Sequence, residues 1–350
     1  MTEDKGILIQ NVYYMLAYAF RFLNQSEYQR IAAEPFDHVH DLFAALLSKG
    51  ISRRLKQGLY REYVPREEAL RVLRGRLNLS QTLRDRLHDR LALHCEYDEL
   101  SEDNPFNQIL KTAALTLLRH PAVHAERKNV LRRQLLLFAS VRTLTPAEIP
   151  WERLTYHRGN LHYRPLINLC RFLLQALLPC DESGAFAVDD LPADEHMHAL
   201  FERFVLEYFR VHHPQLHAAS AHIEWNQDEQ SASSFLLPDM RTDITLHCGD
   251  STLIVDTKYY GRIYQSHFGS SSLRSAHLYQ IYAYVKNMDK THSGKVSGML
   301  LYAQTEGEPS PDSDFLMDGN RISVRTLNLN RPFALISQTL EEVAQSICGE

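Results

Sequence analysis

The C-terminal half of the chain switches between helical and extended hydrophobic patterns. Apolar residues recur at helical spacing over residues 197–210 and again over residues 275–288, and each stripe predicts a helix with one buried face. Short runs of apolar and β-branched residues predict strands at 242–248, 253–258, 296–302 and 322–328. A last helix is expected over residues 334–347. This alternation of helices and strands predicts an α/β domain.

The N-terminal half has a less regular pattern. Residues 7–22 are largely apolar, but Gln10, Asn11 and Arg21 interrupt them. We therefore expect a buried helix there, and neither a signal peptide nor a membrane span. Further helices are predicted at 36–55, 107–120 and 165–178, extended segments at 60–65 and 70–79, and an acidic connector at 98–105. The expected domains are an α+β domain over 1–180, a linker over 181–194 and a second domain over 195–350.

Two of the predicted strands carry carboxylates in register. Gly249-Asp250 separates the runs 242–248 and 253–258, and a two-residue turn there forms a hairpin. Counting outward from that turn pairs Cys248 with Ser251, Leu246 with Leu253 and Asp243 with Asp256. Lys258 lies two residues beyond Asp256, so it points to the same face of the sheet.

The facing acids favour a metal site. Like charges directly opposite one another on a sheet are destabilising, and a shared cation would offset that cost. Two carboxylates beside a lysine fit Mg²⁺-dependent phosphodiester hydrolysis, in which Asp243 and Asp256 hold the metal and Lys258 stabilises charge on the phosphate. The alternative is a surface hairpin with solvated charges. Asp239 is a rival first acid, but it lies about four residues, or ~13 Å at strand rise, from Asp243, which we rank first.

Other side chains could complete this site. Gln280 and Tyr284 are four residues apart and share one face of the predicted helix 275–288. They could orient a phosphate or another ligand, or they could form a half-buried polar edge. Glu202 and Glu207 lie on or near the borders of the apolar stripe in helix 197–210. Either could supply a third carboxylate to the metal, and the alternative for each is a solvated or salt-bridged surface residue.

Basic residues provide candidates for contacts with DNA phosphates. The stretch 260–275 is rich in Gly and Ser, which predicts a mobile loop, and it carries Arg262 and Arg274. Residues 53–90 contain eleven Lys or Arg and five acids, a local net charge of +6, although the whole chain carries −5. Arg74 and Arg76 lie in this basic segment. The segment could follow DNA phosphates, grip an acidic groove of a partner protein, or form a solvated face.

The remaining composition bears on location and on other classes of function. Apolar residues make up 44% of the chain and charged residues 23%, as in soluble globular proteins. The five scattered cysteines lack a Cys-x-x-Cys pair, which predicts reduced thiols, a cytoplasmic location and no structural zinc. The histidines at 196, 198, 212 and 213 lack metal-ligand spacing and are expected mostly at the surface. No Gly-x-x-x-x-Gly-Lys motif occurs, so the chain itself should not hydrolyse a nucleotide.

Several motifs together resemble a known family. The order helix, Asp-bearing strand, Asp-x-Lys strand, helix is similar to the restriction-endonuclease-like PD-(D/E)xK nuclease fold. Gln280-x-x-x-Tyr284 resembles the added helix motif of its RecB-like branch. More narrowly, the chain resembles the McrC family, the nuclease subunits of McrBC modification-dependent restriction systems. The matching stretches are 9–19, 75–77, 107–112, 163–170, 236–245 and 254–260. One departure is Thr242, which stands where the broader fold has a proline before the first acid.

The resemblance implies a role within a larger complex. McrC-like subunits bind an McrB-like AAA+ GTPase hexamer, which carries the reader of modified cytosine (5-methylcytosine). They stimulate its GTPase and cut double-stranded DNA after translocation. The resemblance also implies that Asp243, Asp256 and Lys258 form the nuclease triad, that Mg²⁺ is the cofactor, and that the partner binds GTP. The N-terminal domain would dock on the ring, and no membrane is involved. Two alternatives are a non-catalytic adaptor that activates an AAA+ ring and a free-standing DNA repair nuclease.

Overall fold

The computed structural model describes residues 3–4, 7–21, 31, 34, 36–88, 91–177, 194–226, 237–259, 264–267, 270–304 and 312–348. The chain divides into two compact units: unit 1 comprises Met1–Leu42 and Gln175–Glu350, and unit 2 comprises Phe43–Leu174. The division after residue 174 lies close to the predicted domain boundary. Residues 1–42, however, group with the C-terminal part, so the predicted domain 1–180 is not a single unit. All but the last residue of the predicted linker 181–194 lie outside the described residues.

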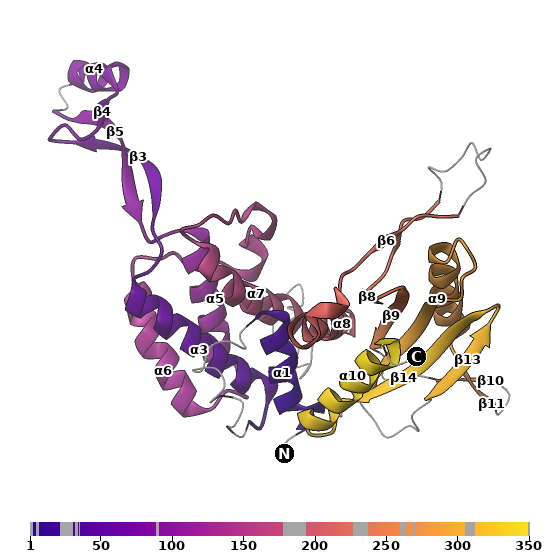
Figure 1. Ribbon diagram of the computed structural model, residues 1–350. Coiled ribbons are helices and arrows are strands. Elements are labelled where there is room, and N and C mark those ends of the chain that lie inside the picture. Colours follow the sequence, from indigo (N-terminus) through magenta and orange to yellow (C-terminus); the bar gives the residue numbers. More distant parts are fainter. Residues whose placement is uncertain are drawn as a thin grey trace. The chain divides into compact units, whose positions relative to one another are not determined.

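Unit 1 is built around a five-stranded sheet (Figure 1). In order across the sheet, its strands are β13 (Ser313–Met317), β14 (Asn320–Asn328), β12 (Val296–Gln304), β9 (Ser251–Tyr259) and β8 (Ile244–Cys248). β12 runs parallel to both of its neighbours, whereas the two edge strands run antiparallel to theirs. Most residues of the three inner strands are buried, as in strands covered on both faces, and those of β12 are mainly apolar. The predicted α/β class with a mixed sheet is therefore confirmed.

The β8–β9 hairpin has the predicted register. Ile244 pairs with Val255, Leu246 with Leu253, and Cys248 with Ser251. Gly249 begins the turn with a φ of +58°, a left-handed conformation that glycine adopts without strain. The sequence pattern therefore placed Asp243 correctly, one residue outside the first paired position of β8.

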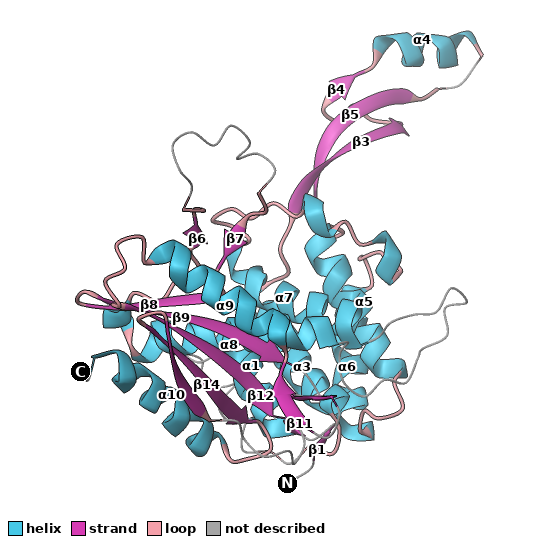
Figure 2. Ribbon diagram, turned by 90° about the vertical axis from the view of Figure 1, so that its right-hand side faces the viewer, coloured by secondary structure: helices cyan, strands magenta, loops and turns pink. Residues whose placement is uncertain are grey.

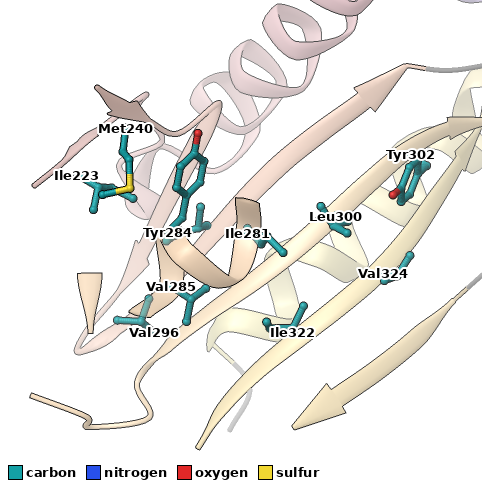
Figure 3. Packing of buried hydrophobic residues seen from close by; sticks show 11 residues of the cluster. Ile223, Met240, Ile281, Tyr284, Val285, Val296, Leu300, Tyr302, Ile322 and Val324 are labelled. Carbon is teal, nitrogen blue, oxygen red and sulfur yellow. The ribbon is translucent and has the colours of Figure 1, made fainter. Parts of the chain in front are cut away.

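Helices cover both faces of this sheet. α9 (Ser275–Met288) packs on one face, where Ile281 and Val285 join an apolar cluster with strand residues that include Leu300 (Figure 3). On the other face, α8 (Asp194–His212) packs against β9, and α10 (Phe333–Cys348) packs against β8, β9 and β14. α9 can approach β12 closely because Gly298 has no side chain. A Cβ atom there would lie 2.7 Å from Ile281 and 2.8 Å from Val285.

The N-terminal helix α1 (Ile9–Ala19) explains why residues 1–42 belong to unit 1. It contacts α8 and α10 and is buried along most of its length, as predicted for residues 7–22. Asn11 donates hydrogen bonds of 2.7 Å to the carbonyl groups of Leu329 and Arg331, and the Tyr18 hydroxyl lies 2.7 Å from His212 Nε2. Neither α1 nor any other helix of the described residues is long and apolar enough to cross a membrane.

A disulfide joins the end of β8 to the end of α10. Cys248 and Cys348 are bonded although 100 residues separate them in the sequence. The prediction of reduced thiols is therefore wrong for this pair, because a contact between such distant segments has no local sequence signature. Cys95 and Cys170 are free and buried, and Cys180 lies outside the described residues.

Unit 2 consists of packed helices and a projecting arm (Figures 1 and 2). Its main helices are α3 (Val39–Gln57), α5 (Pro105–Arg119), α6 (Ala125–Leu135) and α7 (Arg164–Phe172), and α7 continues as a π-helix over Leu173–Leu177. The arm, residues 62–101, is a three-stranded antiparallel sheet with a helix at its tip. Its elements are β3 (Glu62–Leu70), β4 (Arg76–Leu77), α4 (Leu79–Leu87) and β5 (Leu93–Ser101).

Some elements differ from the predictions because their sequences lack a clear hydrophobic period. β5 includes the first residues of the predicted acidic connector 98–105, and α4 begins at the last residue of the predicted extended segment 70–79. α6 was not predicted. Within the predicted mobile loop, β10 (Tyr264–His267) and β11 (Ser270–Leu273) form an antiparallel hairpin. Most residues of β13 are exposed, so its sequence lacks the alternation of apolar and polar residues that predicts a strand.

The remaining short elements are β1 (Glu3–Asp4), β2 (Ile7–Leu8), β6 (His222–Ile223), β7 (Met240–Arg241) and single 3-10 turns at Leu136–Phe138, Pro146–Glu148, Trp151–Arg153, Leu161–Tyr163 and Pro214–Leu216.

Candidate functional site

Asp256 is a fully buried acid near the C-terminal end of β9. Lys258 Nζ lies 2.7 Å from Asp256 Oδ2, but the contact is an ion pair without hydrogen-bond geometry. Neither oxygen of this carboxylate has a hydrogen-bond partner among the described residues. Burial raises the pKa of Asp256 to about 7; the ammonium group of Lys258 opposes this shift, and the charge of Asp243 adds to it. Because buried carboxylate oxygens are normally satisfied by partners, this one is suited to bind a ligand.

Asp243 reaches the same end of β9 from the other strand of the hairpin. Its Oδ2 atom accepts a hydrogen bond of 2.7 Å from the Thr257 backbone N–H and one of 2.8 Å from the Thr257 hydroxyl. Both bonds fall on one oxygen, so the carboxylate is held in place while Oδ1 stays available. The two acids thus meet around Thr257, where the predicted register puts them.

A chain of hydrogen bonds connects Lys258 to α9. Lys258 Nζ donates to Gln280 Oε1 at 3.0 Å, and Gln280 Nε2 donates to the Tyr284 hydroxyl at 3.0 Å. Tyr284 belongs to the apolar cluster beneath α9 (Figure 3), which anchors the far end of this chain. The structure therefore brings Gln280 and Tyr284 together with Lys258, and their contacts orient the lysine.

Glu202 on α8 lies within electrostatic range of both acids. Burial raises its pKa to about 7 and the charge of Asp243 adds to the shift, as does that of Asp256, while Arg241 and Arg203 oppose it. The Glu202 carboxylate therefore senses the charge of both site acids, although it does not form a group of three metal-holding side chains with them among the described residues.

Glu207, the other candidate on α8, is engaged elsewhere. Its buried carboxylate forms ion pairs with Arg203 and Arg210 at 2.9 Å and with Arg21 at 3.3 Å. Three guanidinium groups are therefore paired with the Glu207 carboxylate. Of the two predicted third carboxylates, only Glu202 faces the acid pair.

Two histidines lie beside the site, of which His277 precedes Gln280 by one turn of α9 and His198 was not predicted there. His198 Nε2 lies 2.8 Å from the Thr257 carbonyl oxygen, and its ring is half-buried, so the expected surface position is wrong. Its spacing of four residues from Glu202 on the same helix is the signal that could have found it. His277 Nδ1 lies 2.9 Å from the Tyr302 hydroxyl. Burial, followed by the positive charge of Lys258, lowers the pKa of His277 to about 4, so this ring is neutral at pH 7.

The rival acids lie on the surface. Asp239 is exposed and lies 3.2 Å from His222. Glu224 is also exposed and pairs with Lys290 at 3.5 Å. Neither carboxylate is buried, and each faces a surface partner. The choice of Asp243 over Asp239 therefore agrees with the structure.

Of the two candidate phosphate-binding arginines near the site, the structure describes only Arg274. Arg262 lies outside the described residues. Arg274 directly precedes α9, and its charge helps to lower the pKa of His277. Arg274 is therefore close to the lysine side of the site.

The other two phosphate candidates, Arg74 and Arg76, lie on the arm of unit 2. The Arg74 guanidinium stacks on the Tyr97 ring at 3.9 Å and pairs with Glu99 at 3.7 Å. Arg76 stands opposite Glu96 in the β4–β5 pairing. The contacts of Arg74 stabilise the arm. Both arginines belong to unit 2, whereas the acid pair belongs to unit 1.

The donor set suits Mg²⁺ better than a transition metal. Asp256 supplies a buried carboxylate whose Oδ2 atom is paired with Lys258, and Asp243 supplies a carboxylate fixed through one oxygen. No group of three His, Cys, Asp or Glu side chains close enough to hold a metal occurs in the described part of the chain. Mg²⁺ commonly binds through one or two carboxylates and completes its shell with water and phosphate oxygens, so two acids are sufficient.

Comparisons with known proteins identify the family of the chain. The family described as "McrBC 5-methylcytosine restriction system component" matches residues 3–303. The chain is 25% identical over 343 residues to the type IV methyl-directed restriction enzyme EcoKMcrBC of Escherichia coli (strain K12), covering 97% of this chain and 98% of that protein. Its fold is similar, with a TM-score of 0.56 and 20% identity, to a chain in a half-complex of Thermococcus gammatolerans McrB AAA+ hexamers with bound McrC, covering 97% of this chain and 76% of that one. Because the family match extends over most of its length, the chain belongs to the McrBC family of 5-methylcytosine restriction system components.

Proposed function

We propose that this chain is the DNA-cutting subunit of a modification-dependent restriction complex and hydrolyses phosphodiester bonds with Mg²⁺. The observation that carries the proposal is the convergence of Asp243, Asp256 and Lys258 at one end of β9. The buried Asp256 carboxylate has Lys258 on one oxygen and no hydrogen-bond donor on the other among the described residues, so a cation there would stabilise it. Membership of a restriction-system family supports DNA as the substrate.

Each acidic group has a distinct part in this proposal. Asp243 and Asp256 would hold the metal, and Glu202 is the further carboxylate within range. When bound, Mg²⁺ would polarise the scissile phosphate and lower the pKa of the attacking water. Thr257 fixes the Asp243 carboxylate through both its N–H and its hydroxyl, so the two acids keep a constant separation.

Lys258 would act on the phosphate itself. Its ammonium group stands beside Asp256 and would stabilise the negative charge that develops on the phosphate oxygens. Gln280 holds this ammonium from the side of α9, and Tyr284 fixes the amide of Gln280. Gln280 and Tyr284 are therefore positioning residues, which favour one orientation of Lys258 before substrate arrives.

We further propose that unit 2 docks on an AAA+ GTPase ring and stimulates its GTPase. The arm exposes many large apolar side chains: Tyr63, Val72, Leu73, Leu79, Leu83, Leu87, Leu91 and Leu100. Exposed apolar residues gathered on one projection are typical of a protein contact surface. The solved structure of similar fold holds McrB hexamers with bound McrC, which supports a ring as the partner. The ring would hydrolyse GTP, and the DNA would carry a modified cytosine recognised by the partner.

Cleavage by the reconstituted complex tests the proposal. Asp256→Ala should reduce Mg²⁺-dependent cutting of methylated DNA by at least about a thousandfold, because the metal loses a ligand, while stimulation of the partner's GTPase stays at the wild-type level. Asp239→Ala is the matched control, since it removes an exposed acid, and it should cut like wild type. A folded Asp256→Ala protein that loses both activities would contradict the proposed division of labour.

The same assays separate the two alternative functions. A wild-type complex that stimulates GTP hydrolysis but never cuts DNA would identify the chain as an adaptor. Robust cutting by the purified chain without a ring or GTP would identify a free-standing nuclease. Cutting that requires the ring, GTP and Mg²⁺ together is the expected result.

A further inference from the structure

A cluster of three arginines surrounds one buried acid on the outer side of α8. Arg203 Nη2 and Arg210 Nη1 both lie 2.9 Å from Glu207 Oε1, and Arg21 Nη2 lies 3.3 Å from Glu207 Oε2. Arg203 and Arg210 are one turn before and after Glu207 on the same helix, whereas Arg21 follows α1. The cluster therefore forms only when α1 is packed against α8.

The positive charge of the three arginines exceeds the negative charge of the buried acid. One carboxylate neutralises one guanidinium, so three arginines around Glu207 leave a net charge of +2. The side chain of Glu207 is 2% exposed, but those of Arg21, Arg203 and Arg210 are 69%, 47% and 35% exposed. The acid thus fixes the inner edges of three guanidinium groups, while their outer N–H donors face solvent. This arrangement suits an anion with several oxygens, because a guanidinium binds phosphate through parallel N–H donors.

The position of the cluster relates it to the metal site. Arg203 follows Glu202 in sequence, and the charges of Arg203 and Arg241 both act on the Glu202 carboxylate beside the acid pair. On its other side, Arg210 Nε donates at 3.0 Å to the carbonyl group of Ala218, in the segment that bridges to Thr245 of β8. The arginines therefore lie on the side of unit 1 that carries β8. Of the three, Arg203 lies next to the acids that would cut the DNA.

We propose that Arg21, Arg203 and Arg210 together bind one phosphate group of the DNA backbone on its way to the cleavage site. The proposal rests on the proposed nuclease function and adds a substrate-binding surface to it. Contacts of this type carry no base information; they fix the register of the duplex against the metal site. Each phosphate neutralised in this way releases condensed counterions, so the contribution of the cluster depends on salt.

Binding of a fluorescent 24-base-pair duplex by the full chain, without divalent metal, tests the proposal between 50 and 200 mM NaCl. Arg21→Gln, Arg203→Gln and Arg210→Gln should each weaken binding about three- to tenfold at 100 mM NaCl and reduce the slope of log K against log salt by about 1. Arg203→Lys keeps the charge and should restore most of the slope. Arg321→Gln is the matched control, since Arg321 is 41% exposed and pairs with Asp314 at the opposite edge of the sheet.

The outcomes separate this inference from the nuclease function. If folded variants, checked by melting temperature, keep the wild-type affinity and slope while the assembled complex still cuts DNA, the cluster is structural and the inference is wrong. If the variants bind DNA normally but lose the ring partner, the cluster is a protein contact, which also overturns it. If the wild-type complex neither binds nor cuts DNA, the nuclease proposal fails as well.

Discussion

At the scale of single residues, the proposed metal site would depend on the protonation of two carboxylates. The pKa of Asp256 and that of Glu202 are both raised to about 7, in each case chiefly by burial. An acid with a raised pKa holds its proton below that value, so at pH 6 a metal must displace a proton from each group that ligates it. Around neutral pH, small changes in acidity therefore change the affinity of this site.

We expect the affinity of the full chain for Mn²⁺, used as a probe for Mg²⁺, to fall between pH 8 and pH 6. The fall should approach about tenfold per pH unit for each carboxylate that must lose its proton. Calorimetric titration at pH 6, 7 and 8 measures this directly. Glu202→Gln removes one of the two protons and should make the dependence shallower. An affinity that stays constant from pH 6 to pH 8 would show that neither group ligates the metal.

The acid pair and the lysine could be predicted because strand geometry is simple. A period of two residues and a two-residue turn are enough to put Asp243 opposite Asp256 and Lys258 on the same face. The contact of His198 with Thr257 and the separation of Glu202 from Glu207 depend on how α8 crosses the sheet. That crossing is set by packing between elements, which no local pattern records.

At the scale of elements, the distance between α9 and β12 decides whether Gln280 reaches Lys258. Gly298 permits this distance, because a side chain there would meet Ile281 and Val285 of α9. The strand and helix were predicted with nearly correct bounds from their apolar runs. The closeness of their packing could not be predicted, since a glycine within a strand has several possible causes.

Gly298→Ala should lower the free energy of unfolding by about 1–3 kcal/mol, because an added methyl group overpacks this contact. It should also slow DNA cleavage, as α9 moves away with Gln280. Urea unfolding and cleavage rates measure the two effects. The double variant Gly298→Ala with Val285→Ala frees space at the same point and should recover part of both losses. A single variant with wild-type stability would mean that α9 does not lie this close to β12.

At the scale of the whole molecule, the proposed function assigns ring binding to the arm and DNA cleavage to the sheet. The arm residues Leu83 and Leu87 are exposed on α4 in unit 2. If they contact the ring, Leu83→Ser with Leu87→Ser should weaken association by at least about tenfold, because each buried leucine contributes about 1.5–3 kcal/mol. GTPase stimulation should fall in parallel, measured by titrating the chain into the ring.

Val211→Ser is the control for the arm variant, since Val211 is an exposed apolar residue on α8 of unit 1. It should leave association with the ring unchanged. Equal losses in the arm variant and the control would indicate a general loss of solubility. An arm variant that stimulates the GTPase like wild type would exclude α4 from the contact.

The packing of α1 against α8 and α10 also sets the order in which the molecule can be completed during synthesis. The ribosome makes α1 first, then all of unit 2, and only later the strands and helices on which α1 rests. At ~5–20 residues per second, α1 waits roughly 15–60 s for α10. Unit 2 can fold within that interval, whereas the sheet with Asp243 and Asp256 closes last. A newborn chain therefore brings Asp243 and Asp256 together only after the rest of the molecule has been made.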